Sequence, residues 1–169
     1  VELRAAAGDF VAEVHGIDAR QPLSPEEVTR IEDGMTHFAV LVLRNQHLDD
    51  AQQVSFTRHF GPLLEGANTT KTDAMRLDSA FADVSNVDSQ NNVLARDDRR
   101  RMFSLGNRLW HTDASFRAVP ARYSILSARV VPPHGGNTEF ADMRAAYDAL
   151  DETAKAEVDT LVCEHSLLF

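Results

Sequence analysis

The chain has 169 residues, 43% of them hydrophobic and 25% charged, which is typical of a single globular domain. Its net charge of -9 argues against nucleic acid or an anionic membrane as the main partner, because both require clustered Lys and Arg. The single cysteine, Cys163, excludes an internal disulfide framework. No apolar run long enough to span a membrane and no secretory leader pattern is seen, so we expect a cytoplasmic protein.

The first predicted elements are short and clearly delimited. Residues 10–18, FVAEVHGID, predict a strand or a hairpin. Ser24, Pro25 and Glu27 form the pattern of a capping box, and apolar residues at helical spacing follow them, which predicts a helix. Residues 39–44, AVLVLR, predict a strand that is buried on both faces.

A second helix is expected from about residue 50. Either Asp49 or Asp50 can serve as its N-cap, and Gly61 stops it. Residues 62–108 are then polar and irregular, which favours a mobile lid, with a disordered segment as the alternative.

Two features interrupt this irregular segment. Residues 80–87, AFADVSNV, fit one strand. The arginines 99–101 are interpreted as a solvated face paired with Asp97 and Asp98, and an anion site is the alternative.

The C-terminal part alternates between strand and helix signals. Residues 121–131 and 137–141 predict strands on either side of a turn at 132–136. Asp142 and Asp151 are each placed to cap a helix.

A possible metal site lies in LWHTDASF, residues 109–116. On a strand, His111 and Asp113 would point to the same face and could hold one metal ion together. A further histidine would complete the 2-His-1-carboxylate set that suits ferrous iron. Chance alone gives about one His-x-Asp triplet in this composition, and a second occurs at 47–49, so a plain His–Asp hydrogen bond stays an alternative.

The surrounding residues resemble one family. NRLWHTDASF, followed by PARYSILSARVVPPHGGNTEFADMRAAYDAL, is similar to the TauD/TfdA family of Fe(II)- and 2-oxoglutarate-dependent dioxygenases, most densely over residues 107–150. PARYSILSA and TEFADMRAAYDAL resemble the TfdA branch, which acts on 2,4-dichlorophenoxyacetate and related aryloxyalkanoates.

The resemblance assigns roles to five residues. His111 and Asp113 match the first two iron ligands, and Thr138 matches a residue that binds the remote carboxylate of 2-oxoglutarate. Lys71 matches a lysine that meets the substrate carboxylate, with an exposed loop lysine as the alternative. Asn107 matches a polar position near the substrate, with a turn-forming asparagine as the alternative.

Neighbouring residues are expected to have structural roles. We interpret Trp110 as a core residue, because it points away from its neighbours on a strand. His59 and His134 are taken as surface or helix-end histidines, and Gly135 and Gly136 as turn residues. His165 matches a position in the family that is not a ligand.

The implied fold is a mixed α/β (α+β) one, with a double-stranded β-helix (jelly-roll) core and flanking helices. Residues 1–169 would form a single dioxygenase domain that lacks its C-terminal part, since the chain ends on the strand-like Leu167-Leu168-Phe169. The family's third iron ligand, a histidine, and its 2-oxoglutarate-binding arginine are expected beyond Phe169. These 169 residues alone are therefore expected to be inactive.

The implied activity uses Fe(II), with 2-oxoglutarate and O₂ as cosubstrates, to hydroxylate a small anionic organic substrate. An aryloxyalkanoate would be cleaved to a phenol and a 2-oxo acid. Two alternatives are a taurine, alkylsulfonate or sulfate-ester dioxygenase of the same family, and a non-catalytic jelly-roll module that binds a small acid or a metal. A hydrolytic zinc enzyme is disfavoured, because no His-Glu-x-x-His helix is present. The sequence is also compatible with a homo-oligomer.

Overall fold

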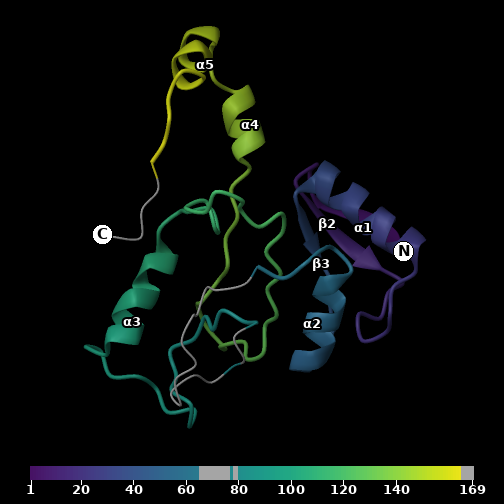
Figure 1. The fold of residues 1–169 in the computed structure, drawn as a ribbon, viewed down its shortest axis with the longest axis vertical. Helices are drawn as coiled ribbons and strands as arrows, with labels where there is room; N and C mark the ends of the chain where they lie inside the picture. Colours follow the sequence, from purple (N-terminus) through teal and green to yellow (C-terminus); the bar gives the residue numbers. More distant parts are fainter. Residues whose placement is uncertain (65–76, 78–79, 165–169) are drawn as a thin grey trace. The chain divides into compact units, whose positions relative to one another are not determined.

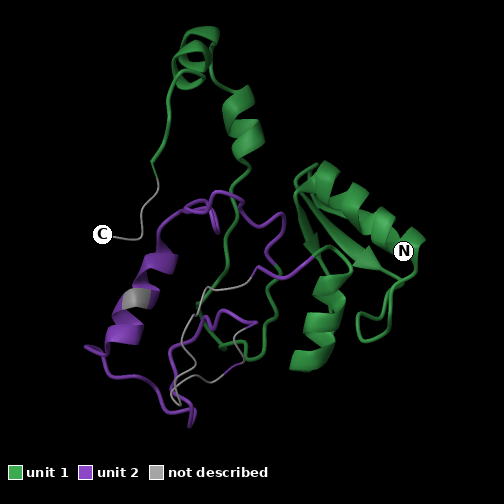
Figure 2. Cartoon of the chain, viewed as in Figure 1, with its two compact units in different colours: residues 1–61, 125–164 green, residues 62–124, 165–169 purple. Residues whose placement is uncertain are grey.

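The computed structural model describes residues 1–64, 77 and 80–164. The chain falls into two compact units, which are described separately below (Figures 1 and 2). The first unit comprises residues 1–61 and 125–164, and the second comprises residues 62–124 and 165–169. Within the described part, no helix has the length and hydropathy needed to cross a membrane.

A three-stranded sheet organises the first unit, in the order β1-β2-β3. Strand β1 (Glu2–Ala7) pairs antiparallel with β2 (Val11–His15). Strand β2 confirms the strand expected within residues 10–18, whereas β1 was not predicted. Strand β3 (Val40–Val42) pairs parallel with β2. The central strand supplies two core residues, Ala12 and Val14. The prediction that β3 is buried on both faces is wrong, because β3 is an edge strand whose residues are only half-buried.

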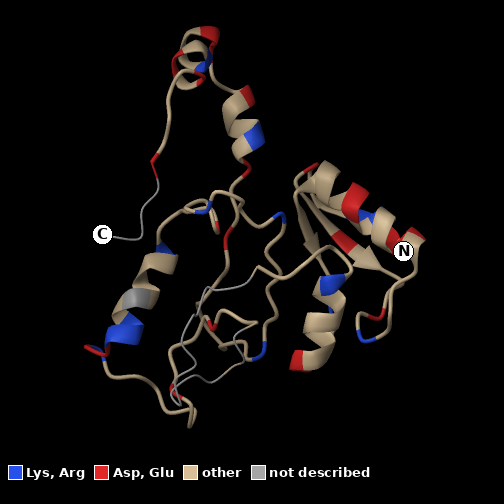
Figure 3. Cartoon of the chain, viewed as in Figure 1, with Lys and Arg blue, Asp and Glu red and all other residues tan. Residues whose placement is uncertain are grey.

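Helix α1 (Pro25–Phe38) connects the two parallel strands, as parallel pairing requires a crossover (Figure 1). Its predicted capping box is present: Glu27 N–H donates to Ser24 Oγ at 3.2 Å, and Ser24 N–H donates to a Glu27 side-chain oxygen at 2.9 Å. Charged residues of both signs lie along this helix (Figure 3).

The helix packs closely on the sheet at Gly34. A Cβ atom at this position would lie 2.7 Å from Leu3 Cδ1 and 3.2 Å from Leu41 Cδ1. Because such a separation is shorter than van der Waals contact, glycine permits the close approach of helix and strands. Ile31 is buried on the same helix and completes the contact.

Helix α2 (Asp50–Arg58) begins with Asp49 as its N-cap, in agreement with one of the two expected caps. Phe56 is buried and meets Phe60 edge-on, with ring centroids 5.3 Å apart. Gln53 is also buried, and it accepts a hydrogen bond of 2.8 Å from Arg129. This bond ties the later part of the first unit to α2.

Two short helices follow in the first unit, each with its predicted cap. Asp142 caps α4 (Met143–Asp148), and Asp151 caps α5 (Glu152–Val158). Arg144 donates to the carbonyl oxygens of residues 36 and 37, which are free of helical partners at the end of α1.

The second unit contains two elements in its described part, α3 (Arg99–Ser104) and the 3₁₀ helix η1 (Leu105–Arg108). Arg100 forms two side-chain hydrogen bonds to Asp98, and these lower the pKa of that carboxyl group to about 2. The interpretation of Arg100 as paired with a neighbouring aspartate is confirmed. The helix itself was not expected from the sequence.

Three predicted strands are absent from the described residues. Residues 121–131 and 137–141 have no ladder partner, and residue 87 of the segment 80–87 makes only an isolated bridge to Val93. Side chains at 121–128 nevertheless alternate between half-buried and exposed, as in extended backbone. A strand also needs a neighbour to satisfy its backbone groups, and the described part of the chain supplies none here.

The capping box of α1 gives a direct stability prediction. Replacing Ser24 by Ala should lower the free energy of unfolding by about 1 kcal/mol, because the first turn loses a side-chain acceptor. Ser24→Gly is the matched control and should cost only a few tenths of a kcal/mol. Urea unfolding followed by circular dichroism measures both, and equal losses in the two variants would contradict the capping role.

Candidate metal centre

The candidate site follows η1 directly along the chain. The backbone at Leu109 is extended, with φ -90° and ψ 144°, and the chain then enters a turn at Asp113. Residues 111–113 are therefore not part of a strand, contrary to the expectation. The two side chains still meet, although His111 lies in the irregular stretch before the turn and Asp113 begins the turn itself.

His111 and Asp113 converge on one point between them. Nε2 of His111 lies 3.3 Å from Oδ1 of Asp113. Nδ1 of the same ring lies 2.8 Å from the carbonyl oxygen of Leu109. A carbonyl oxygen only accepts, so Nδ1 carries the hydrogen and donates it. Nε2 is then the nitrogen directed at the carboxylate.

The carboxylate of Asp113 has a second partner on its other oxygen. The hydroxyl of Ser124 donates to Oδ2 at 2.7 Å. The two oxygens of Asp113 therefore have different environments, with Oδ1 toward the imidazole and Oδ2 toward the serine. Sequence analysis did not identify Ser124, because no motif links a serine to a carboxylate eleven residues earlier.

This arrangement fits two positions of a metal site. An imidazole that ligates a metal through one nitrogen commonly donates its other N–H to a backbone carbonyl, and a ligating carboxylate is commonly hydrogen-bonded as well. His111 and Asp113 show both features. Their side chains are 47% and 58% exposed, so an ion can reach them.

No complete metal site is found in the described residues. Residues 1–64, 77 and 80–164 contain no cluster of three or more His, Cys, Asp or Glu side chains able to hold an ion. The pair alone provides one nitrogen and one carboxylate donor, which matches two members of a 2-His-1-carboxylate set. The geometry thus brings together two of the three donors that such a set requires.

The other predicted site residues lie in different parts of the chain. Asn107 lies on η1 in the second unit and is exposed. Thr138 is exposed in the first unit, two residues after the glycines of the turn. Gly135 and Gly136 have φ values of 70° and 71°, which confirms their role in that turn. Lys71 lies outside the described residues.

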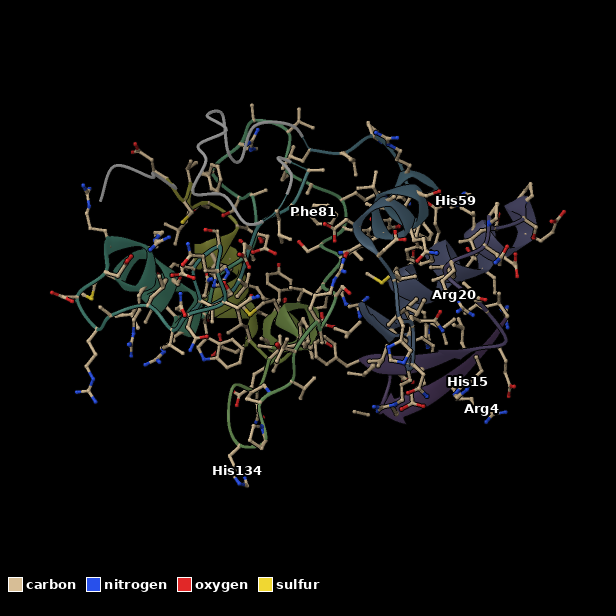
Figure 4. The ribbon with its side chains drawn as sticks, turned by 90° about the horizontal axis from the view of Figure 1, so that it is seen from below. Arg4, His15, Arg20, His59, Phe81 and His134 are labelled. Carbon is tan, nitrogen blue, oxygen red and sulfur yellow. The ribbon has the colours of Figure 1, made fainter. Side chains whose placement is uncertain are left out.

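The remaining histidines near the motifs have structural positions. His59 ends α2 and its Nε2 accepts the backbone N–H of Leu23 at 3.2 Å, whereas His134 lies exposed on its loop (Figure 4). Both agree with the expectation. Asp49 of the second His-x-Asp triplet is occupied as a helix cap. The interpretation of Trp110 as core is wrong, because it is 70% exposed and lies outside the strands found in the described residues.

Comparison with known proteins identifies the family of this chain. The model of the TauD, TfdA family, described as taurine catabolism dioxygenase TauD, matches residues 2–168. The chain belongs to this family.

Two relatives of the chain carry the names of dioxygenases. The chain is 47% identical over 160 residues to the alpha-ketoglutarate-dependent 2,4-dichlorophenoxyacetate dioxygenase of Cupriavidus pinatubonensis. This alignment covers 94% of the present chain and 56% of that protein. It is 42% identical over 132 residues to the (S)-phenoxypropionate/alpha-ketoglutarate-dioxygenase of Sphingobium herbicidovorans. This alignment covers 77% of the present chain and 41% of that protein. The chain thus spans about half the length of the curated relatives it matches.

A solved structure shows the same relationship in three dimensions. The crystal structure of AAD-2 in complex with Mn(II) and N-oxalylglycine matches with a TM-score of 0.87 and 50% sequence identity. The match covers 99% of this chain and 57% of that protein.

The hydrogen bond of His111 predicts which nitrogen binds a metal. When Zn(II) is added to the protein that the gene encodes, we expect Nε2 of His111 to bind the ion while Nδ1 keeps its proton. The ¹⁵N chemical shifts of the ring nitrogens measure this. Metal bound at Nδ1, with the proton on Nε2, would contradict the geometry.

Proposed function

We propose that this protein is an Fe(II)- and 2-oxoglutarate-dependent dioxygenase that acts on an aryloxyalkanoate. One observation carries the proposal: the imidazole of His111 and the carboxylate of Asp113 converge to 3.3 Å, each held by a further hydrogen bond. The 47% identity to a 2,4-dichlorophenoxyacetate dioxygenase supports the reaction class.

In this proposal His111 and Asp113 hold the ferrous ion, through Nε2 and Oδ1 respectively. Iron, when bound with 2-oxoglutarate, supplies the activation of O₂ that is coupled to decarboxylation of the oxo acid. Nδ1 of His111 keeps its proton on the Leu109 carbonyl, so Nε2 can present its lone pair. Thr138 is proposed to donate its hydroxyl to the remote carboxylate of 2-oxoglutarate.

The proposed reaction has a defined balance. Substrate, O₂ and 2-oxoglutarate give hydroxylated substrate, succinate and CO₂, with one oxygen atom in the new hydroxyl and one in succinate. Hydroxylation of an aryloxyacetate beside the ether oxygen gives a hemiacetal. Loss of the aryloxy group from this hemiacetal then yields a phenol and glyoxylate. The protein must hold the reacting carbon near the metal and exclude water.

Two residues are proposed to recognise the substrate. The ammonium group of Lys71 complements a carboxylate, which gives a local positive charge in a protein with a net charge of -9. Asn107 lies on η1, four residues before His111, and its exposed amide can donate to a bound acid.

The proposal extends to the fold and its context. We propose a jelly-roll core for the protein, supported by the match to AAD-2 at 50% identity. A single dioxygenase domain over residues 1–169, with residues 62–108 as a lid, stays a prediction. So does a cytoplasmic location, which cell fractionation tests.

Anaerobic titration of the encoded protein with Fe(II) and 2-oxoglutarate tests the metal site. We expect a weak visible charge-transfer band, and we expect Asp113→Ala to abolish it, because the ion loses a charged ligand. Asp49→Asn is the matched control: it also removes one carboxylate from a His-x-Asp triplet but keeps a residue able to cap α2. A normal band in Asp113→Ala would count against the assignment.

A substrate panel tests the reaction. We expect 2,4-dichlorophenoxyacetate to be converted to 2,4-dichlorophenol and glyoxylate, with one succinate formed per molecule of 2,4-dichlorophenol. Taurine and an alkyl sulfate ester should give little product. Faster turnover of either sulfur compound would move the protein to the alternative substrate class. Binding of 2-oxoglutarate without turnover on any member of the panel would favour a non-catalytic module.

A further inference from the structure

The oxygen of Asp113 that does not face His111 is held by a serine. Ser124 Oγ donates to Oδ2 at 2.7 Å, while Oδ1 lies 3.3 Å from Nε2. A hydroxyl that donates to a carboxylate forms a short, charge-assisted hydrogen bond, about twice as strong as a neutral one. The contact is therefore one of the stronger local restraints on the aspartate.

The chain reverses direction to make this contact. Ala114, directly after the aspartate, has a φ of 57°, in the left-handed region that few non-glycine residues adopt. The N–H of Arg117 donates to the carbonyl of Ala114 at 3.0 Å, and the Ser115 hydroxyl donates to the carbonyl of Thr112 at 3.2 Å. These bonds close the turn that follows the metal motif.

Ser124 then meets the carboxylate from an extended segment. Residues 121–128 alternate between half-buried and exposed positions, and Ser124 is on the exposed side. Its neighbours 123 and 125 are on the other side, so neither is placed to replace its hydroxyl. The serine and the aspartate both belong to the second unit.

A carboxylate needs such a partner because its terminal torsion is soft. The χ2 angle of aspartate is broadly distributed, so an exposed carboxylate rotates easily. A donor fixed on Oδ2 sets the plane of the group and leaves Oδ1 toward the imidazole. Orientation by a hydrogen-bonded partner is the way in which metal-ligating carboxylates are commonly tuned.

We propose that Ser124 is a positioning residue that orients Asp113 for metal binding. The inference rests on the proposed function, in which Asp113 is a ligand to the ferrous ion. Ser124 itself contacts the carboxylate and acts on the metal only through it.

Titration of the encoded protein with Mn(II) alone, followed by electron paramagnetic resonance of the free ion, tests this role. Ser124→Ala should weaken Mn(II) binding about 10- to 100-fold, the range found when an outer partner of a metal ligand is removed. Ser124→Thr keeps a hydroxyl and should restore most of the affinity. Ser127→Ala is the matched control, since it removes a hydroxyl from the same extended segment on the opposite side.

The outcomes separate this inference from the proposed function. Unchanged affinity in Ser124→Ala, together with strong loss in Asp113→Ala, would overturn the role of Ser124 and leave the proposed function standing. Unchanged affinity in Asp113→Ala would overturn both. Equal losses in Ser124→Ala and Ser127→Ala, or no recovery in Ser124→Thr, would show a general structural effect and would also overturn the positioning role. The thermal unfolding midpoint of each variant confirms that the protein stays folded.

Discussion

The 3.3 Å approach between Nε2 of His111 and Oδ1 of Asp113 is the contact on which the proposed function depends. Each partner is held from outside the pair, the ring by the Leu109 carbonyl and the carboxylate by the Ser124 hydroxyl. These two hydrogen bonds hold the pair without the participation of an ion.

The two units of the chain are stabilised in different ways. Five of the buried apolar residues belong to the first unit, where α1 and α2 accompany the sheet, and in the described part of the second unit only Leu94 is buried to this degree. The geometry of His111 and Asp113 therefore depends on a turn and on side-chain hydrogen bonds more than on local packing. In such a setting, the hydrogen bond from Ser124 can affect the orientation of Asp113, as proposed above.

Local signals in the sequence predicted the four helices that begin with a side-chain cap, because a cap and the turn it serves lie within a few residues, whereas α3 was not predicted. Ser24, Asp49, Asp142 and Asp151 all cap helices as expected. The prediction of strands at 121–131 and 137–141 was wrong. A strand also requires a neighbouring strand to pair with its backbone groups, and its own residues do not specify that neighbour. Half-buried and exposed side chains alternate at 121–128, as expected for the extended backbone that the sequence predicted there.

The candidate site was predictable only in part. Spacing and family resemblance pointed to His111 and Asp113, although the expected strand is replaced by a turn. The hydroxyl that donates to the carboxylate could not be predicted, because it comes from Ser124, eleven residues later, beyond the turn at Ala114 with its positive φ. Long-range contacts of this kind depend on the fold of the backbone and leave no fixed spacing in the sequence.

The most direct test of the central claim is a crystal structure of the encoded protein soaked with Mn(II), with the ion located by its anomalous scattering. The account predicts one anomalous peak in contact with both Nε2 of His111 and Oδ1 of Asp113, with Nδ1 still bonded to the Leu109 carbonyl. A peak that contacts only one of these two side chains would contradict the account. A peak elsewhere, with no ion bound between His111 and Asp113, would also contradict it.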